Sequence, residues 1–205
     1  MGLHKLERSK HKASRMQRWI LPAIALLIAV LLLFGGETAR EWLRFDRQGI
    51  RAGEVWRLVT GHFVHLGWPH FALNAAGLAL VWTLVGDVFD RPHWLLIVVA
   101  SILTMDIGLW LFDPELMWYV GLSGLLHGIL AAALLKKLRK PDKETVALTV
   151  LLLGKLAWEQ LIGPLPGSEG TAGGAVVVDS HLFGALGGAL GAIWLRIRVR
   201  PAAAI

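Results

Sequence analysis

The chain has 205 residues, of which 55% are apolar and 18% are charged, with a formal net charge of +6 and no cysteine. The absence of cysteine excludes thiol catalysis, disulfide bonds and cysteine-ligated metal sites. The apolar residues form long blocks with few charges, which is typical of proteins in a lipid bilayer and excludes an ordinary water-soluble domain. The length predicts a single domain.

Six apolar blocks are long enough to form membrane helices. They comprise residues 19–34, 71–88, 94–112, 120–138, 146–162 and 181–195. No small-x-small cleavage site follows the first block, so we expect an uncleaved anchor rather than a secretory signal. The sequence therefore predicts an all-α membrane protein with six transmembrane helices.

Two connections between these blocks are long. Residues 35–69 contain two amphipathic stretches, 41–45 and 55–59, which predict an external hairpin lying partly in the outer membrane interface. Residues 163–178 are rich in glycine and include two prolines, a composition that predicts a flexible external loop suited to capping a site.

The positions of the basic residues predict the orientation. Fifteen of the 21 lysine and arginine residues precede the first block, follow the last or lie in connections on that same side, whereas only five lie on the other side. The positive-inside rule then places both termini in the cytoplasm. We divide the chain into a basic cytoplasmic segment (1–18), a six-helix membrane domain (19–196) and a basic cytoplasmic tail (197–205). The charge thus indicates topology and contact with anionic lipids rather than nucleic-acid binding.

Polar side chains inside apolar helices are costly in a bilayer and are usually functional or paired. Ser123, His181 and Asn74 each lie 13 to 15 residues from the inner end of their predicted helix. At 1.5 Å per residue this is about 20 Å, so three helices bring these residues to one level. That level is about 10 Å below the outer edge of a hydrocarbon core of about 30 Å.

The serine lies in the sequence Gly121-Leu122-Ser123-Gly124, at the beginning of a predicted helix. The flanking glycines leave room for a substrate backbone, and the helix N-terminus offers N–H groups to an oxyanion. This pattern favours a nucleophilic role for Ser123. The alternative is a face of small residues that packs against another helix.

His181 is followed on the same helix face by Gly184 and Gly188. A bare face lets another helix approach closely, so His181 could reach Ser123 and act as its base. The alternative is a glycine-rich packing seam in which the histidine caps the helix. His127 lies four residues after Ser123 and could itself be the base, or could stack against His181 and orient it.

His70 and Asn74 are four residues apart and share a helix face, so both could donate hydrogen bonds to an oxyanion. A zinc site that uses His62, His65 and His70 is the rival interpretation, but no carboxylate belongs to this motif. We therefore expect no metal and no cofactor.

Lys155 and Glu159 form an i, i+4 pair within the fifth block, and we interpret them as two charges that neutralise each other. Asp106 lies near the level of the serine. It could orient a histidine, but a structural hydrogen bond is the interpretation we favour.

Residues 54–190 resemble the rhomboid intramembrane proteases. The resemblance rests on short motifs in the external hairpin and in the second, fourth and sixth helices. These motifs are Glu54-x-Trp56-Arg57 with Thr60, His65, His70-x-x-x-Asn74, Gly121-x-Ser123-Gly124 and His181-x-x-Gly184-x-x-x-Gly188. The resemblance implies a Ser123–His181 dyad without an obligatory acid. It also implies that His70, Asn74 and the Ser123 backbone N–H bind the oxyanion.

One position departs from the family pattern. Many rhomboid proteases carry tyrosine four residues after the serine, where this chain has His127. The sequence of residues 121–128, the compact core and the lack of a further domain resemble the bacterial rhombosortase subgroup. That resemblance implies an enzyme in the bacterial inner membrane whose site opens to the periplasm. Its substrates would be membrane-anchored exported proteins with C-terminal sorting tails that contain a Gly-Gly motif.

Two other functions stay open at this point. A catalytically inactive rhomboid-like protein would bind membrane helices without cutting them, although both Ser123 and His181 are present. A small transporter or a lipid head-group enzyme would use Lys155, Glu159 and Asp106. Whether an accessory or chaperone protein is needed is also open.

Overall fold

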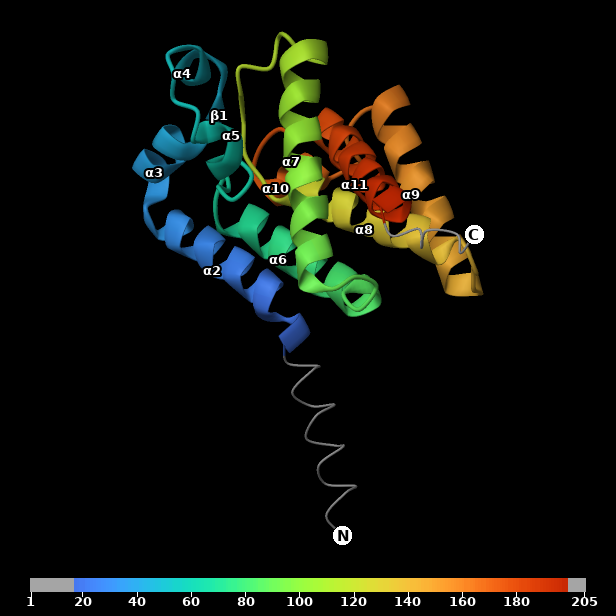
Figure 1. Cartoon of the computed structure of the whole chain (residues 1–205). Helices are drawn as coiled ribbons and strands as arrows, with labels where there is room; N and C mark the ends of the chain where they lie inside the picture. Colours follow the sequence, from blue (N-terminus) through green and yellow to red (C-terminus); the bar gives the residue numbers. More distant parts are fainter. Residues whose placement is uncertain (1–16, 199–205) are drawn as a thin grey trace, which may run out of the picture.

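The computed structural model describes residues 17–198, which form a bundle of helices (Figure 1). Each of the six predicted apolar blocks overlaps one long helix, so the helical fold class is confirmed. The long helices are α2 (Ile20–Phe34), α6 (Trp68–Val85), α7 (Arg91–Phe112), α8 (Ser123–Lys137), α9 (Lys143–Leu161) and α11 (Val178–Arg198). The short elements are α3 (Gly36–Leu43), β1 (Phe45–Asp46), α4 (Arg47–Arg51), α5 (Arg57–Thr60), β2 (Trp118–Tyr119) and α10 (Ser168–Ala172). The predicted segments 1–18 and 197–205 lie almost wholly outside the described residues.

Local sequence sets several helix boundaries. The carboxylates of Asp90 and Asp142 accept hydrogen bonds from backbone N–H groups in the first turns of α7 and α9. Helix α6 begins at Trp68, three residues before the predicted start, because Pro69 fits the first turn of a helix. Helix α8 begins at Ser123, three residues later than predicted, because Gly121 has φ +133°, a backbone conformation that cannot belong to a right-handed helix.

The strands β1 and β2 form a short antiparallel pair that the all-α prediction did not include. Phe45 pairs with Tyr119 and Asp46 with Trp118. A two-residue pair has no periodicity that a sequence could show. It connects the segment between α2 and α6 (residues 35–67), predicted as an external hairpin, to the segment that leads directly into α8.

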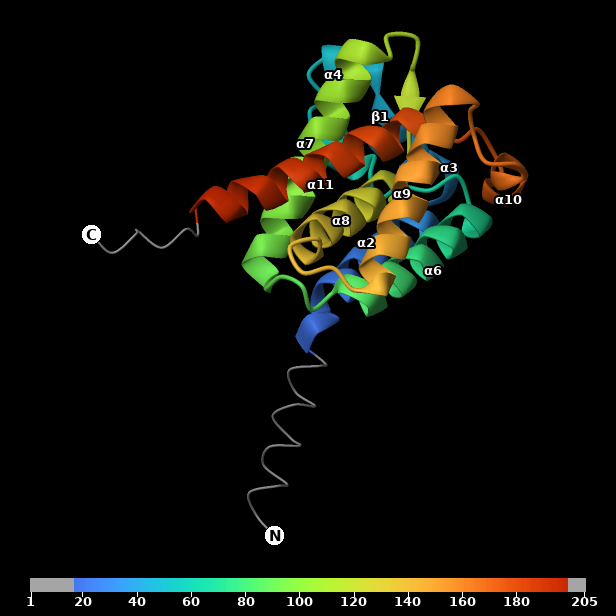
Figure 2. The same ribbon diagram turned by 90° about the vertical axis from the view of Figure 1, so that its right-hand side faces the viewer.

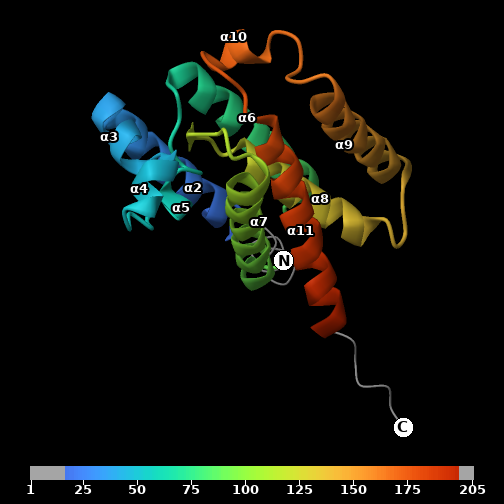
Figure 3. The same cartoon turned by 90° about the horizontal axis from the view of Figure 1, so that it is seen from above.

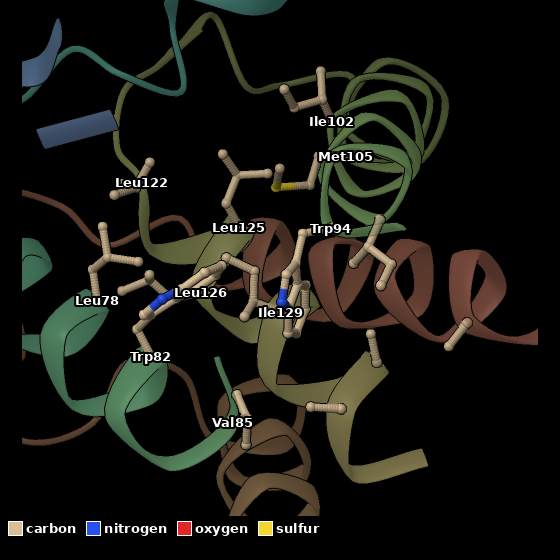
Figure 4. Packing of buried hydrophobic residues seen from close by; sticks show 14 residues of the cluster. Leu78, Trp82, Val85, Trp94, Ile102, Met105, Leu122, Leu125, Leu126 and Ile129 are labelled. Carbon is tan, nitrogen blue, oxygen red and sulfur yellow. The ribbon is translucent and has the colours of Figure 1, made fainter. Parts of the chain in front are cut away.

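Helix α8 lies at the centre of the bundle, in contact with α6, α7, α9 and α11. Figure 2 shows α11 crossing α7 and running alongside α8. The main apolar core joins α6, α7 and α8, and Figure 4 shows Trp82 and Trp94 packed beside Leu126 and Ile129. The rings of Trp82 and Trp94 lie 5.2 Å apart. Because α8 is enclosed by other helices, its 15 residues need not reach either membrane surface.

Glycines allow α8 and α11 to pack backbone against backbone. A Cβ atom added at Gly184 would collide with the carbonyl oxygen of Gly124, and one added at Gly188 would collide with that of Gly128. No side chain larger than hydrogen fits at these two positions while the helices keep their present spacing. Such small-residue contacts are common between membrane helices.

Within residues 17–198, three helices are long and apolar enough to cross a membrane: α6, α7 and α11. Helices α2 and α3 together are a fourth candidate if they form one span, although the chain bends by 117° between them. Helix α8 is about 22 Å long, short of a hydrocarbon core of about 30 Å, and α9 carries Lys155 and Glu159. The structure therefore shows three to four candidate spans, and six crossings stay a prediction.

Large apolar side chains point outward from the long helices. Leu80, Leu111, Leu151, Leu161 and Leu190 are each more than half exposed. A monomer in water rarely exposes apolar surface on so many elements. Lipid acyl chains would cover this surface, as expected for a multi-pass membrane protein.

The glycine contact between α8 and α11 should be sensitive to one added methyl group. We expect Gly184→Ala to lower the melting temperature in detergent, because overpacking costs about 1–3 kcal/mol. Gly154→Ala in α9 is the matched control, since a Cβ there would meet no atom within 4 Å. Equal melting temperatures for the two variants would contradict this account of the packing.

Candidate active site

Ser123 is the first residue of α8, and the turn before it is held firmly. The backbone N–H of Gly121 donates to the carbonyl of Gly61 at 3.1 Å, and the Tyr119 hydroxyl donates to the carbonyl of Gly121 at 2.6 Å. Burial raises the pKa of Tyr119, so its hydroxyl stays a donor. Gly121 has φ +133°, a region that other residues rarely adopt, and a Cβ there would meet the His70 ring. This turn therefore fixes the place of the Ser123 hydroxyl.

His181 projects from the first turns of α11 toward Ser123. Its Nε2 lies 2.9 Å from the Ser123 Oγ, within hydrogen-bond distance. His181 is buried, whereas Ser123 is half-buried. The structure thus brings together the two residues that the sequence suggested as nucleophile and base, at the end of the helix contact made by Gly124 and Gly184.

The other ring nitrogen of His181 faces α9. Its Nδ1 lies 2.9 Å from Glu159 Oε2, and Glu159 Oε1 accepts a hydrogen bond of 2.6 Å from Lys155 Nζ. The Lys155–Glu159 pair predicted from the sequence is present, but its contact with His181 was missed. Counting 1.5 Å per residue from the beginning of the helix could have found it. Glu159 lies 16 residues after Lys143, about 24 Å along the helix and level with His181.

His127 stacks on His181, with ring centroids 4.3 Å apart and planes inclined by 21°. Its Nδ1 lies 2.7 Å from the Ser123 carbonyl oxygen rather than the hydroxyl. Of the two roles left open for His127, this position fits the orienting one. The ring forms one wall of the pocket that holds His181.

His70 and Asn74 lie on α6 beside the Gly121 turn. The backbone N–H of Leu66 lies 3.3 Å from His70 Nδ1, so in this arrangement Nδ1 accepts and the ring proton sits on Nε2. Asn74 is buried, and its Nδ2 donates to the His70 carbonyl at 3.2 Å. The His70 ring lies beside Gly121, and both His70 and Asn74 line the same cavity as Ser123, the first residue of α8, where a negative charge is favoured.

A cavity of about 490 Å³ joins these groups. Figure 3 shows the connection that carries α10 arching from the end of α9 past the beginning of α6. Residues from this connection complete the cavity wall, and a Cβ at Gly174 would meet Leu66. Six segments line the cavity: α6, the β2 segment, α8, α9, the connection that carries α10, and α11. Their side chains include His70, Leu73, Asn74, Tyr119, Val120, Ser123, His127, Lys155, Glu159, Leu165, Ser168, Thr171, Val176, Val177, Ser180 and His181.

One group of side chains could hold a metal ion. Ligand atoms of His127, Glu159 and His181 lie within 4.8 Å of one another. However, the Lys155 ammonium lies 2.6 Å from Glu159 and 3.3 Å from His181, so a cation already accompanies the carboxylate. A second cation there would be repelled. Within residues 17–198, His62, His65 and His70 do not form such a group.

Asp106 and two further histidines lie behind the site. Asp106 Oδ1 is 3.1 Å from His62 Nε2, and both residues are buried, which agrees with the structural hydrogen bond favoured from the sequence. Burial, together with the charge of His70, lowers the pKa of His65 to about 4, so this ring is neutral at physiological pH. These residues support the hairpin rather than line the cavity.

Comparison with known proteins gives one family. The model of the Rhomboid domain matches residues 52–198. The chain is 31% identical over 142 residues to rhomboid protease GluP of Bacillus subtilis. It is 25% identical over 177 residues to putative rhomboid protease YdcA of the same organism. It is 28% identical over 142 residues to rhomboid protease GlpG of Salmonella newport. These matches cover 66%, 83% and 68% of the chain, and 28%, 85% and 50% of the respective relatives. The chain therefore spans about a quarter of GluP and half of GlpG.

Proposed function

Because the chain belongs to the rhomboid family, we propose that it is an intramembrane serine endopeptidase that cleaves membrane-anchored proteins in or near their transmembrane segments. The observation that carries the proposal is the distance of 2.9 Å between Ser123 Oγ and His181 Nε2, at the wall of a cavity of about 490 Å³. A hydroxyl with an imidazole at this distance is the arrangement that nucleophilic catalysis requires.

The reaction would proceed in two halves. Ser123 Oγ attacks a peptide carbonyl carbon while His181 Nε2 takes the hydroxyl proton. The tetrahedral intermediate collapses, His181 returns the proton to the leaving amine, and an ester to Ser123 remains. Water then attacks this ester with His181 again as base, which releases the new carboxyl terminus and restores the Ser123 hydroxyl.

The oxyanion of each intermediate would lie at the N-terminus of α8. The Ser123 backbone N–H belongs to the first turn of the helix, which has no acceptor within the helix. His70 Nε2–H and Asn74 Nδ2 add two donors from α6. Preorganised donors of this kind stabilise charge that develops in the transition state.

We further propose that the chain crosses the bacterial inner membrane six times, with residues 1–18 and 197–205 in the cytoplasm and the cavity open to the periplasm. The basic residues at the inner ends of α8 and α11, Lys136, Lys137 and Arg196, support this orientation. The enclosed position of α8 supports a short fourth crossing whose ends are shielded by protein.

The substrate class that we propose is the exported proteins of the rhombosortase type, whose C-terminal tails carry a Gly-Gly motif, a helix and basic residues. The support is the sequence of residues 121–128 with His127 in place of the family's tyrosine. In the structure His127 takes the stacking position against His181. Co-expression with candidate tail-anchored proteins, followed by mass spectrometry of the new C-terminus, would identify the substrate and the cut.

Removal of the Ser123 hydroxyl tests the nucleophile. We expect Ser123→Ala to abolish labelling by a fluorophosphonate probe and cleavage of a membrane-anchored substrate, because no other hydroxyl is hydrogen-bonded to His181 among the described residues. Thr83→Ala, which removes an exposed hydroxyl from α6, is the matched control and should label normally. Equal labelling of Ser123→Ala and the unchanged protein would refute the proposal.

Removal of the Asn74 amide tests the oxyanion site. We expect Asn74→Ala to lower kcat by about 10²-fold with little change in KM, because a lost oxyanion donor acts mainly in the transition state. Gln48→Ala removes an exposed amide from α4 and should leave both constants unchanged. A rise in KM without a fall in kcat would instead assign Asn74 to substrate binding.

The orientation can be measured directly because the chain lacks cysteine. In intact spheroplasts we expect a membrane-impermeant maleimide to label Glu115→Cys, between α7 and β2, but not Lys140→Cys, between α8 and α9. Both side chains are exposed, so accessibility from the two sides of the membrane decides the result. Labelling of Lys140→Cys before permeabilisation would contradict the proposed topology.

A further inference from the structure

We infer that Glu159 is a positioning residue that holds His181 in its reactive tautomer, and that it does so in competition with Lys155 for the same ring nitrogen. This inference rests on the proposed peptidase function. It adds an acid to a site for which family resemblance implied only a dyad, and it gives the Lys155–Glu159 pair a role beyond neutralising charge.

Two groups of opposite hydrogen-bonding character face His181 Nδ1. Glu159 Oε2 lies 2.9 Å away and Lys155 Nζ lies 3.3 Å away. An ionised carboxylate can only accept a hydrogen bond, and an ammonium group can only donate one. Nδ1 therefore carries a proton when it pairs with Glu159 and lacks one when it pairs with Lys155.

The choice at Nδ1 decides what Nε2 can do. With the proton on Nδ1, the lone pair of Nε2 faces Ser123 Oγ at 2.9 Å and can take the hydroxyl proton. With Lys155 donating to Nδ1, a neutral ring carries its proton on Nε2 and cannot act as base. The two partners of one nitrogen thus select between a reactive and an unreactive tautomer.

The structure favours the reactive choice because Glu159 uses both oxygens. Oε1 accepts from Lys155 at 2.6 Å while Oε2 faces His181, so the ammonium is held by the carboxylate more closely than by the ring. Both side chains line the cavity, but Glu159 is only 2% exposed whereas Lys155 is 30% exposed. Lys155 can therefore complete its hydrogen bonds with water, whereas Glu159 depends almost wholly on its protein partners.

No other carboxylate can replace Glu159 among the described residues that surround His181. His127 stacks on one face of the ring, Ser123 faces Nε2, and His70 lies on the same cavity wall. The other buried carboxylate of the bundle, Asp106, is bonded to His62. When His181 becomes charged during proton transfer, Glu159 is the anion in contact with it and stabilises that charge.

The test compares four variants in kcat, KM and melting temperature, with the labelling of Ser123 as a separate measurement. We expect Glu159→Gln to lower kcat by about 10²-fold or more with little change in KM, because the freed Lys155 can donate to Nδ1. Lys155→Met should lower kcat by less than about 10-fold, since Glu159 still accepts from Nδ1. Glu159→Asp should retain more activity than Glu159→Gln because the carboxylate remains.

The double variant gives the sharpest result. Lys155→Met combined with Glu159→Gln should recover about 10-fold in kcat over Glu159→Gln alone, because the competing donor is gone and the glutamine oxygen can accept from Nδ1. If Glu159→Gln fails to fold, the double variant, which buries no unpaired charge, is compared with Lys155→Met, from which it differs only by the loss of the carboxylate, and its kcat should be the lower of the two. Glu144→Gln makes the same chemical change at the exposed beginning of α9 and should leave activity unchanged.

A spectroscopic measurement separates tautomer control from a structural role. In the ¹⁵N spectrum of histidine-labelled protein, the His181 signal should change from the Nδ1-protonated to the Nε2-protonated form in Glu159→Gln. The inference would be overturned if Glu159→Gln and Lys155→Met lost kcat equally, the double variant recovered fully and the tautomer did not change. Lys155 and Glu159 would then be only a neutralising ion pair. Normal cleavage by Ser123→Ala would instead overturn the proposed function.

Discussion

The close packing of α8 against α11 is the constraint on which the site depends. Ser123 and His181 belong to different helices, and each lies near the N-terminal end of its own. A hydrogen bond of 2.9 Å between them is possible only because Gly124 and Gly184 let the two backbones touch. Since the interaction between membrane helices comes from packing rather than from exclusion of water, small residues control it directly. These glycines set the distance between the two helices.

A second set of contacts fixes the other end of the serine turn. Arg47 is buried and donates to the carbonyl oxygens of Leu109, Trp110, Asp113 and Leu116, which ties the hairpin to the end of α7. The β1–β2 pair and the Gly121–Gly61 hydrogen bond continue this connection to Ser123. The hairpin, which the sequence suggested as an element of the membrane interface, is therefore also the scaffold that places the start of α8.

Some of this organisation could be predicted from the sequence and some could not. Apolar blocks and depth counting indicated the long helices and brought Ser123, His181, His70 and Asn74 to one level, because helix rise is uniform. The β1–β2 pair and the role of Arg47 depend on residues about 60 to 75 positions apart, which local patterns do not encode. The contact of Glu159 with His181 was missed for another reason. Lys155, four residues earlier on the same helix, already explained the negative charge of Glu159 as part of an ion pair.

A buried ion pair gives a helix little net stability, because the loss of hydration offsets most of the attraction between the charges. In a membrane helix this cost is larger, since the lipid offers no substitute for water. Lys155 and Glu159 would thus be a poor means of stabilising α9 alone. The second oxygen of Glu159 changes this balance, because it meets a histidine that needs an acceptor on Nδ1. The charge of Glu159 is costly for the fold, and its contact with His181 supplies the one hydrogen bond that the proposed base would require on Nδ1.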